Sequence, residues 1–220
     1  MSQLKLGVLI SGGGSNFQSI VDHIEDGSLP AEVAVVISNE PEAGGLNRAK
    51  KHGIDALVVN HRDYPSREAF EEKLIEILKS YNVELVVLAG FMRLLSPKLI
   101  ETFPHRIMNI HPALLPSFPG THVWQDQLDH GVKFAGCTVH FVDPGMDTGP
   151  IIIQAVVPVL DDDDADTLAQ RILKQEHRTY PMAIKLFAQG RLEIEGRRVK
   201  IRPAEHEQDQ SCLTNPLVDF

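Results

Sequence analysis

Short apolar runs rich in valine and isoleucine recur through the first half of the chain, and segments with helical spacing lie between them. Strands that are buried on both faces have this continuous apolar character, and their alternation with helices is typical of a parallel sheet covered on both sides. We therefore predict an α/β fold with a mostly parallel central sheet and helices on both faces. The predicted strands are 6–10, 33–37, 56–59, 85–89 and 107–110.

Four segments between and after these strands have the spacing of helices. The segment that follows Ser66 is the clearest, because serine is a favoured N-cap residue and apolar side chains then recur on one helical face. That face comprises Phe70, Leu74, Ile77 and Leu78. The other predicted helices are 16–25, 46–51 and 167–189.

The pattern changes beyond the fifth strand. Pro112, Pro116 and Pro119 with Gly120 predict a long irregular stretch, since proline does not fit a helix interior. Two further strands are expected at 135–142 and 151–159, and a closing hairpin at 192–201. No interdomain linker is visible, so we expect a single domain over 1–202. The polar residues 203–220 lack periodicity and are expected to form a poorly ordered tail.

Composition limits the classes of partner. The chain has 21 lysine and arginine residues against 30 aspartate and glutamate residues, a formal net charge of −9, which disfavours a basic surface for nucleic acid. Cys137 and Cys212 stand apart from any Cys/His cluster, so neither a zinc site nor a disulfide framework is expected. No apolar run approaches the roughly 18 residues of a membrane span, and no cleavage signal is visible. We expect a cytoplasmic protein without membrane or nucleic-acid partners.

The first motif is the segment 11–16, which reads Ser-Gly-Gly-Gly-Ser-Asn between the first strand and the first helix. Glycines permit a sharp turn close to a ligand, and a helix N-terminus presents N–H groups to an anion. The dinucleotide-binding pattern fails because Phe17 stands at its last glycine position, and the P-loop lysine is absent. A phosphate cradle and a simple turn capped by Ser15 are equally consistent with these residues.

The second motif is Asn-Ile-His-Pro at 109–112. On a strand, Asn109 and His111 project from the same face, and Pro112 ends the strand just beyond them. Open α/β sheets bind ligands outside such strand ends, and an amide beside an imidazole suits the binding of an oxyanion. A capping asparagine with a hydrogen-bonded histidine explains the same residues and is slightly favoured on this motif alone.

The remaining candidates are acidic. Asp143 and Asp147 lie in a turn-rich loop between two predicted strands, where turn chemistry alone could explain them. Four aspartates at 161–164 precede the last long helix. Their spacing is not that of a calcium loop, so we interpret them as a solvated turn that supplies the helix N-cap.

Taken together, these segments resemble one family, the glycinamide ribonucleotide formyltransferases of purine synthesis. The shared segments are the loop 11–16, Leu-Ala-Gly-Phe-Met-Arg-x-Leu-Ser at 88–96, Asn-Ile-His-Pro-x-Leu-Leu-Pro at 109–116, Val-His-Phe-Val at 139–142, Asp-x-Gly-Pro at 147–150 and Glu-His at 176–177. The resemblance runs from about Lys5 to Leu192, and the order and spacing make it specific. It implies a Rossmann-like formyltransferase fold with the folate in a cleft over the strand ends.

The resemblance also implies residue roles. The catalytic residues would be Asn109, His111 and Asp147. The substrate, glycinamide ribonucleotide, would be bound through its phosphate by Gly14, Ser15 and Asn16 and through its ribose by Glu176. The folate would contact Arg67, Met92, Arg93, Leu94, Leu95, Asn109, Val142 and Asp143. The cosubstrate would be 10-formyltetrahydrofolate, no metal would be needed, and the protein would act as a monomer or homodimer.

In the implied reaction an amine attacks the formyl carbon, and Asn109 with a protonated His111 stabilises the charge that develops on the formyl oxygen. Asp147, if it lies beside His111, would favour the charged imidazole and could help to move a proton through a water. The alternatives are a formyltetrahydrofolate hydrolase with water as acceptor, and a nucleotide-binding module without catalysis. The hydrolases and the initiator-tRNA formyltransferases usually have an additional domain that we do not find in this sequence.

Overall fold

The computed structural model describes residues 3–202 and 214–215, and these divide into two compact units, one ending at Asn109 and one beginning at Ile110. The elements of the first unit and of its boundary strand β5 are β1 Leu4–Ile10, α1 Ser15–Glu25, β2 Ala31–Ser38, α2 Gly44–Lys51, β3 Ala56–Val58, η1 His61–Asp63, α3 Arg67–Ser80, β4 Leu85–Leu88, α4 Pro97–Thr102 and β5 Ile107–His111. All five predicted strands and three of the predicted helices are thus confirmed.

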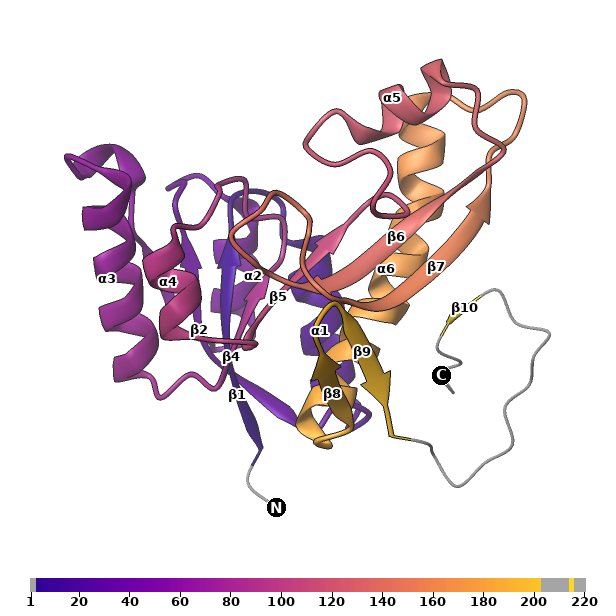
Figure 1. Ribbon diagram of the computed structural model, residues 1–220. Coiled ribbons are helices and arrows are strands. Elements are labelled where there is room, and N and C mark those ends of the chain that lie inside the picture. Colours follow the sequence, from indigo (N-terminus) through magenta and orange to yellow (C-terminus); the bar gives the residue numbers. More distant parts are fainter. Residues whose placement is uncertain (1–2, 203–213, 216–220) are drawn as a thin grey trace. The chain divides into compact units, whose positions relative to one another are not determined.

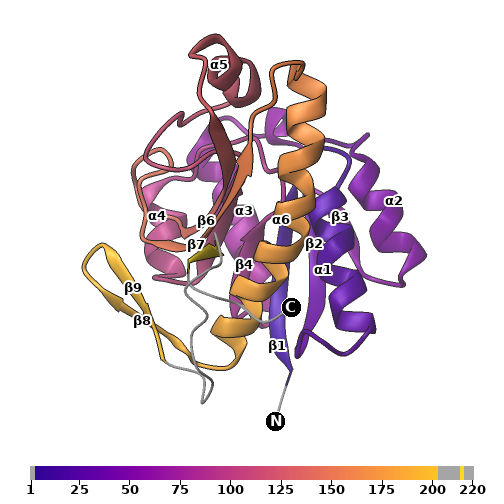
Figure 2. The same ribbon diagram turned by 90° about the vertical axis from the view of Figure 1, so that its right-hand side faces the viewer.

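The sheet of the first unit has the order β3-β2-β1-β4-β5, and every neighbouring pair is parallel. The chain runs outward from β1 to β3 and then returns to β4 on the other side of β1. Because such crossovers are right-handed, the helices of the two halves cover opposite faces. Figures 1 and 2 show α1 and α2 on one side of the sheet and α3 and α4 on the other. This arrangement confirms the predicted α/β, Rossmann-like class.

The reversal of strand order has a functional consequence. Loops that leave β1 and β4 diverge to opposite faces of the sheet, and open α/β sheets bind ligands in the crevice at this switch point. The carboxyl-terminal parts of these strands are apolar: Leu9 and Ile10 of β1 and Val87 of β4 are fully buried. The first unit therefore presents a rigid core below the loops that begin at Ser11 and Ala89.

The second unit contains α5 Val123–Asp129, β6 Phe134–Phe141, β7 Ile151–Pro158, α6 Ala165–Ala188, β8 Leu192–Glu195, β9 Arg198–Ile201 and β10 Thr214–Asn215. β6 and β7 are antiparallel, β8 and β9 form the predicted hairpin, and β9 runs parallel to β7. β10 pairs with β7 in the antiparallel direction. Apart from this short strand, the predicted disordered tail lies outside the described residues.

Helix α6 packs on β6 and β7 through a buried face that includes Ile172, Tyr180 and Ile184. Its N-cap is Asp164, whose carboxylate accepts from the Thr167 N–H at 2.8 Å, while the Thr167 hydroxyl accepts from the Asp164 N–H at 2.9 Å. The predicted N-cap is therefore confirmed, but the turn is not solvated throughout. The Asp163 side chain is only 2% exposed, and its carboxylate accepts from Arg171 Nη2 at 2.7 Å.

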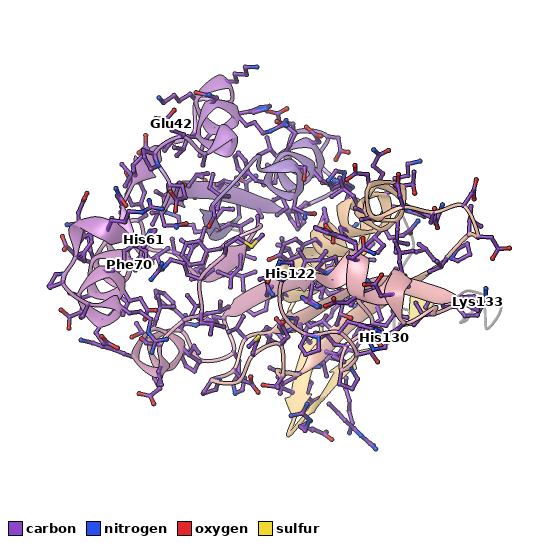
Figure 3. All side chains as sticks on the ribbon, turned by 90° about the horizontal axis from the view of Figure 1, so that it is seen from above. Glu42, His61, Phe70, His122, His130 and Lys133 are labelled. Atoms are coloured by element: carbon purple, nitrogen blue, oxygen red, sulfur yellow. The ribbon has the colours of Figure 1, made fainter. Side chains whose placement is uncertain are left out.

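Two expectations about local structure need correction. The stretch after Pro112 is not irregular throughout, because α5 begins at Val123, four residues beyond Pro119, with His122 and His130 at its two ends (Figure 3). The cap of α1 is Gly14 rather than Ser15, since Gly14 takes the left-handed conformation and Ser15 is already helical. Ser66 caps α3 as predicted, with its hydroxyl 3.2 Å from the Ala69 nitrogen.

Among the helices of residues 3–202 and 214–215, none combines the length and the apolar composition that crossing a bilayer demands.

Candidate active site

The glycine loop between β1 and α1 is shaped by close backbone packing. Gly14 has φ 73° and ψ 35°, and a Cβ atom at this residue would lie 2.8 Å from the Cα atom of Gly45 at the start of α2. A Cβ at Gly45 would in turn lie 2.5 Å from Ile10 Cδ1. The Gly14 position therefore requires glycine, whereas a side chain at Gly45 would require Ile10 to shift, and the loop leads directly into the first turn of α1. The N–H groups of such a turn lack intrahelical acceptors and are suited to an anion.

Arg48 is a neighbour of this loop that the sequence did not reveal. Its Nε donates to the carbonyl oxygen of Gly13 at 2.8 Å, and its Nη1 lies 3.4 Å from the Gln18 side-chain oxygen. The guanidinium thus adds a positive charge beside the helix N-terminus and fixes the Gly13 peptide. Gly13 and Arg48 are separated by 35 residues, so no local pattern points to this contact.

The segment that follows β4 presents apolar side chains to solvent. Met92 and Leu94 are 70% and 58% exposed, whereas the Arg93 guanidinium lies over the Phe70 ring at 5.6 Å from its centroid. His61 also packs against Phe70, edge to face (Figure 3). Alternate residues of the segment thus point away from the protein, while Arg93 is held against α3. Leu95 is half-buried.

Arg67, the predicted folate contact on α3, is the first residue of that helix. It lies in the same unit as the segment 92–95 and is exposed apart from a 3.8 Å contact with Glu68. An exposed guanidinium is suited to bind a carboxylate of a ligand.

His111 and Asp147 come together in the second unit. His111 is the last residue of β5 and only 4% exposed. Its Nε2 lies 2.7 Å from the Phe118 carbonyl oxygen, and its Nδ1 lies 3.5 Å from Asp147 Oδ2. Because a carbonyl oxygen only accepts, Nε2 carries a hydrogen and donates it to Phe118. A second proton on this imidazole must therefore reside on Nδ1, beside the carboxylate.

Asp147 is held in place by its backbone and by a main-chain donor. Its φ of 54° puts it in the left-handed region, and the Gly120 N–H donates to its Oδ2 at 3.0 Å. The carboxylate is 13% exposed and lies between two imidazoles, with His140 Nε2 at 3.8 Å from Oδ1. A non-glycine residue in this conformation is uncommon and is often found at a functional site.

His140 was missed as a site residue, although it stands in the quoted segment 139–142. It is buried on β6, and its Nδ1 donates to the carbonyl oxygen of Phe141 at 2.9 Å. Burial lowers the pKa of His140, while the Phe141 carbonyl and the Asp147 carboxylate act in the opposite direction. We infer a neutral ring whose Nε2 lone pair faces Asp147. The signal that could have identified it is its position one residue before the end of a strand that leads into the acidic loop.

The other predicted residues are distributed over both units. Asn109 lies two residues before His111 on β5, so both side chains leave the same face of that strand. Asp143 Oδ1 accepts from the Gly145 N–H at 3.1 Å and from the Thr148 hydroxyl at 2.6 Å, which orders the turn that leads to Asp147. Val142 is half-buried, and Glu176 is buried on α6.

Within residues 3–202 and 214–215, no group of three or more histidine, cysteine, aspartate or glutamate side chains is arranged to hold a metal ion. The cluster that the residues of the second unit do form consists of a carboxylate between two imidazoles. Such a set can donate hydrogen bonds to an oxyanion and relay a proton.

The fold and this cluster define a known class. The family model described as formyl transferase matches residues 4–184. The chain therefore belongs to the formyl transferase family.

Individual relatives show to which family within the formyl transferases the chain belongs. The phosphoribosylglycinamide formyltransferase of Escherichia coli is 43% identical over 85% of this chain and 88% of its own length. The solved structure of glycinamide ribonucleotide transformylase 1 from Symbiobacterium toebii is 56% identical, with a TM-score of 0.90 over 91% of this chain and 94% of that one. Within the formyl transferases, the chain is thus a member of the phosphoribosylglycinamide formyltransferase family.

Longer relatives contain a similar segment. The trifunctional purine biosynthetic protein adenosine-3 of Drosophila melanogaster is 49% identical over 84% of this chain, which spans only 14% of the length of that protein.

Proposed function

We propose that this protein transfers the formyl group of 10-formyltetrahydrofolate to the amine of glycinamide ribonucleotide. The products are formylglycinamide ribonucleotide and tetrahydrofolate, in de novo purine biosynthesis. The observation that carries the proposal is the buried His111–Asp147 pair, with Nδ1 and Oδ2 3.5 Å apart, at the end of the strand that also bears Asn109. Family membership supports the choice of acceptor, as do the relatives of similar length, the phosphoribosylglycinamide formyltransferases of Escherichia coli and Haemophilus influenzae.

The proposed mechanism begins with attack of the amine nitrogen on the formyl carbon. A carbon–nitrogen bond forms and negative charge develops on the formyl oxygen. The Asn109 side-chain NH₂ and a protonated His111 donate to this oxygen. Since Nε2 of His111 donates to Phe118, the extra proton lies on Nδ1, and Nδ1–H is the group that donates to the formyl oxygen. The Asp147 carboxylate, 3.5 Å from Nδ1, stabilises the imidazolium through its charge.

The second half of the reaction breaks the bond between the formyl carbon and N10 of the folate. The attacking amine must lose a proton and N10 must gain one, so the net proton transfer is from acceptor to leaving group. We assign this transfer to a water bound by Asp147, whose Oδ1 is the carboxylate oxygen on the side of neutral His140. No metal and no covalent enzyme intermediate is required.

The binding subsites are part of the same proposal. Gly14, Ser15 and Asn16 receive the substrate phosphate at the N-terminus of α1, and Glu176 contacts its ribose. The segment Met92–Leu95 binds the folate mainly through its backbone and its exposed apolar side chains.

Arg67 is suited to the glutamate carboxylate of the folate, because a guanidinium can donate two parallel hydrogen bonds to it. Asn109, Val142 and Asp143 are the remaining proposed folate contacts.

We further propose that the protein acts in the cytoplasm as a monomer or homodimer, on small molecules and without nucleic acid. The acidic balance of the chain, with a net charge of −9, supports the last point.

The test is release of tetrahydrofolate from 10-formyltetrahydrofolate with and without glycinamide ribonucleotide. Asp147→Asn and His111→Ala should each lower kcat by on the order of 10²–10³, the usual effect of removing one donor to an oxyanion or its support. Asp129→Asn is the matched control, because Asp129 is an exposed aspartate at the end of α5 that accepts only from Gln125 at 2.7 Å.

Each outcome is informative. Release that depends on the acceptor, and is lost in both site variants but not in the control, supports the proposal. Equal release without acceptor would show that water is the acceptor and would favour the hydrolase alternative. The absence of release under either condition would refute the proposed activity.

A further inference from the structure

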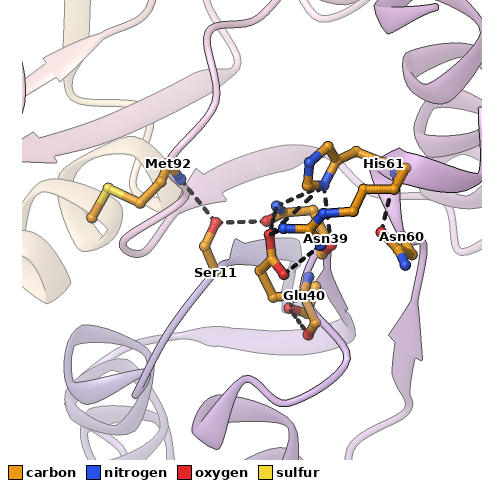
Figure 4. A network of polar contacts seen from close by, with 8 residues as sticks. Ser11, Asn39, Glu40, Asn60, His61 and Met92 are labelled. Atoms are coloured by element: carbon orange, nitrogen blue, oxygen red, sulfur yellow. Dashed lines mark hydrogen bonds and ion pairs between the residues drawn. The ribbon is translucent and has the colours of Figure 1, made fainter.

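The loops that follow β1 and β4 are joined at Ser11 by two hydrogen bonds. Its backbone N–H donates to the Gly90 carbonyl oxygen at 3.0 Å, and its hydroxyl forms the second bond. Ser11 is the first residue after β1, and its Oγ accepts from the Met92 N–H at 2.9 Å and donates to Asn39 Oδ1 at 2.6 Å (Figure 4). β1 and β4 are the neighbouring strands at which the strand order reverses. The bond to Met92 therefore lies at the switch point of the sheet, the place where open α/β sheets bind their ligands.

The direction of this hydrogen-bond chain is set by a charge at its far end. Arg62 donates two bonds to the Glu40 carboxylate, at 2.9 and 3.1 Å, and these bonds lower the pKa of Glu40. An ionised carboxylate only accepts, so the Asn39 atom that lies 3.3 Å from Glu40 Oε1 must be the NH₂ group.

The orientation of the Asn39 amide decides the role of the serine. With Nδ2 facing Glu40, Oδ1 faces Ser11, and the Ser11 hydroxyl must donate its only hydrogen to Asn39. Its lone pairs are then oriented toward the Met92 N–H. Asn39 is 3% exposed and also has Nδ2 3.3 Å from His61 Nδ1, which leaves the amide little freedom to turn (Figure 4).

The segment that begins at Met92 is held at its other end as well. The buried Glu71 carboxylate accepts from the Ser96 N–H at 2.9 and 3.0 Å and from the Ser96 hydroxyl. The backbone from Met92 to Ser96 is thus tied at both ends to buried polar side chains. Two of the side chains between these ties, Met92 and Leu94, remain exposed.

We propose that Ser11 is a positioning residue for folate, which acts by holding the Met92 backbone through the chain Arg62–Glu40–Asn39–Ser11. This inference rests on the proposed function, since it takes the segment 92–95 as the folate contact. Ser11 does not itself touch the reacting atoms. Loss of its hydroxyl releases the Met92 N–H, while the bond from the Ser11 backbone N–H to Gly90, the glycine loop and the His111–Asp147 pair remain in place.

The experiment compares Ser11→Ala with wild type in three measurements. Isothermal titration calorimetry with tetrahydrofolate measures binding without turnover, and amide hydrogen exchange by NMR reports on the Met92 N–H. Steady-state kinetics separate the KM values of the two substrates. Ser11→Thr restores the hydroxyl, and Ser80→Ala is the control, because Ser80 donates only to the Ile77 carbonyl at the end of α3.

We expect Ser11→Ala to weaken tetrahydrofolate binding and to raise the folate KM by about three- to tenfold, the usual effect of one lost hydrogen bond. Exchange at Met92 should accelerate, whereas the KM for glycinamide ribonucleotide and kcat should change by less than about twofold. Ser11→Thr should recover most of the folate affinity. Asn39→Ala should weaken folate binding in the same direction as Ser11→Ala.

Two results would count against the inference. Unchanged tetrahydrofolate affinity in Ser11→Ala would overturn it, and so would an equal loss of affinity for both substrates, which would indicate general damage to the fold. Failure of the wild-type protein to bind tetrahydrofolate is a different result, because it would refute the folate assignment of the proposed function itself.

Discussion

The substitution Gly14→Ala tests whether the geometry of the glycine loop controls substrate binding. An L-residue in the left-handed region costs about 1–2 kcal/mol, of which about 0.4–1 kcal/mol is offset by the reduced freedom of the unfolded chain. At Gly14 the new Cβ would also lie 2.8 Å from the Gly45 Cα atom. That is at least ~0.7 Å short of ordinary carbon–carbon contact, so the two backbones must separate.

A matched control is available in the same unit. Gly27 has φ 80°, and a Cβ there would meet nothing within 4 Å. Gly27→Ala therefore carries the conformational cost alone, about 1 kcal/mol or less. Gly14→Ala adds the cost of overpacking, typically about 1–3 kcal/mol. At about 2–4 °C per kcal/mol for a chain of this size, we expect Tm to fall by up to about 4 °C in Gly27→Ala and by about 2–16 °C in Gly14→Ala.

The larger difference is expected in catalysis. Displacing a binding group by about 1 Å can cost on the order of 10² in rate, so kcat/KM for glycinamide ribonucleotide should fall about 10- to 100-fold in Gly14→Ala and stay unchanged in Gly27→Ala. Steady-state kinetics with the acceptor varied at saturating folate provide the measurement, and thermal unfolding shows how much of each protein is folded. If both variants had the same Tm and the same kcat/KM, the packing argument and the phosphate assignment would both be refuted.

Three further outcomes can be checked by simpler measurements. Thr138→Val should lower the free energy of unfolding in urea by about 2–4 kcal/mol, because its buried hydroxyl accepts from the Leu115 N–H at 3.1 Å and that donor would lose its partner. Cys137 should resist iodoacetamide in the native protein at mildly alkaline pH, as quantified by peptide mass spectrometry, since burial raises the pKa of its thiol to about 12. Glu40→Gln should lower the urea midpoint near neutral pH and have progressively less effect as the pH falls below 4.5. The bonds from Arg62 depress the folded-state pKa of Glu40 below its ordinary 4.5, so the stabilisation is present above that value and is lost as the pH falls through the folded pKa.

Much of the fold follows from local pattern. The strands of the first unit are continuous apolar runs because both faces of a parallel sheet are covered, and burial of Leu9 and Ile10 confirms this reason. Ser66 and Asp164 could be recognised as caps, since a cap depends on a residue type and on a donor a few positions away. Helix α5 could not be recognised from the sequence, because it is short and its few residues after the prolines have no clear amphipathic period.

In the candidate site, too, some features follow from local pattern and others do not. That Asn109 and His111 leave one face of a strand follows from the period of two along any strand. The contact of His111 with Asp147 joins positions 36 residues apart, and it depends on the turn after β6 and on the left-handed backbone at Asp147.

Other contacts had no counterpart in the sequence pattern. Arg48 reaches the Gly13 carbonyl across 35 residues, and Ser11 reaches Met92 across 81. Residue types, periodicity and caps act over a few positions and are therefore legible in the sequence alone. Strand order and close packing decide which polar groups finally meet. For that reason, only the tertiary structure revealed the contacts of Ser11, Arg48 and His140.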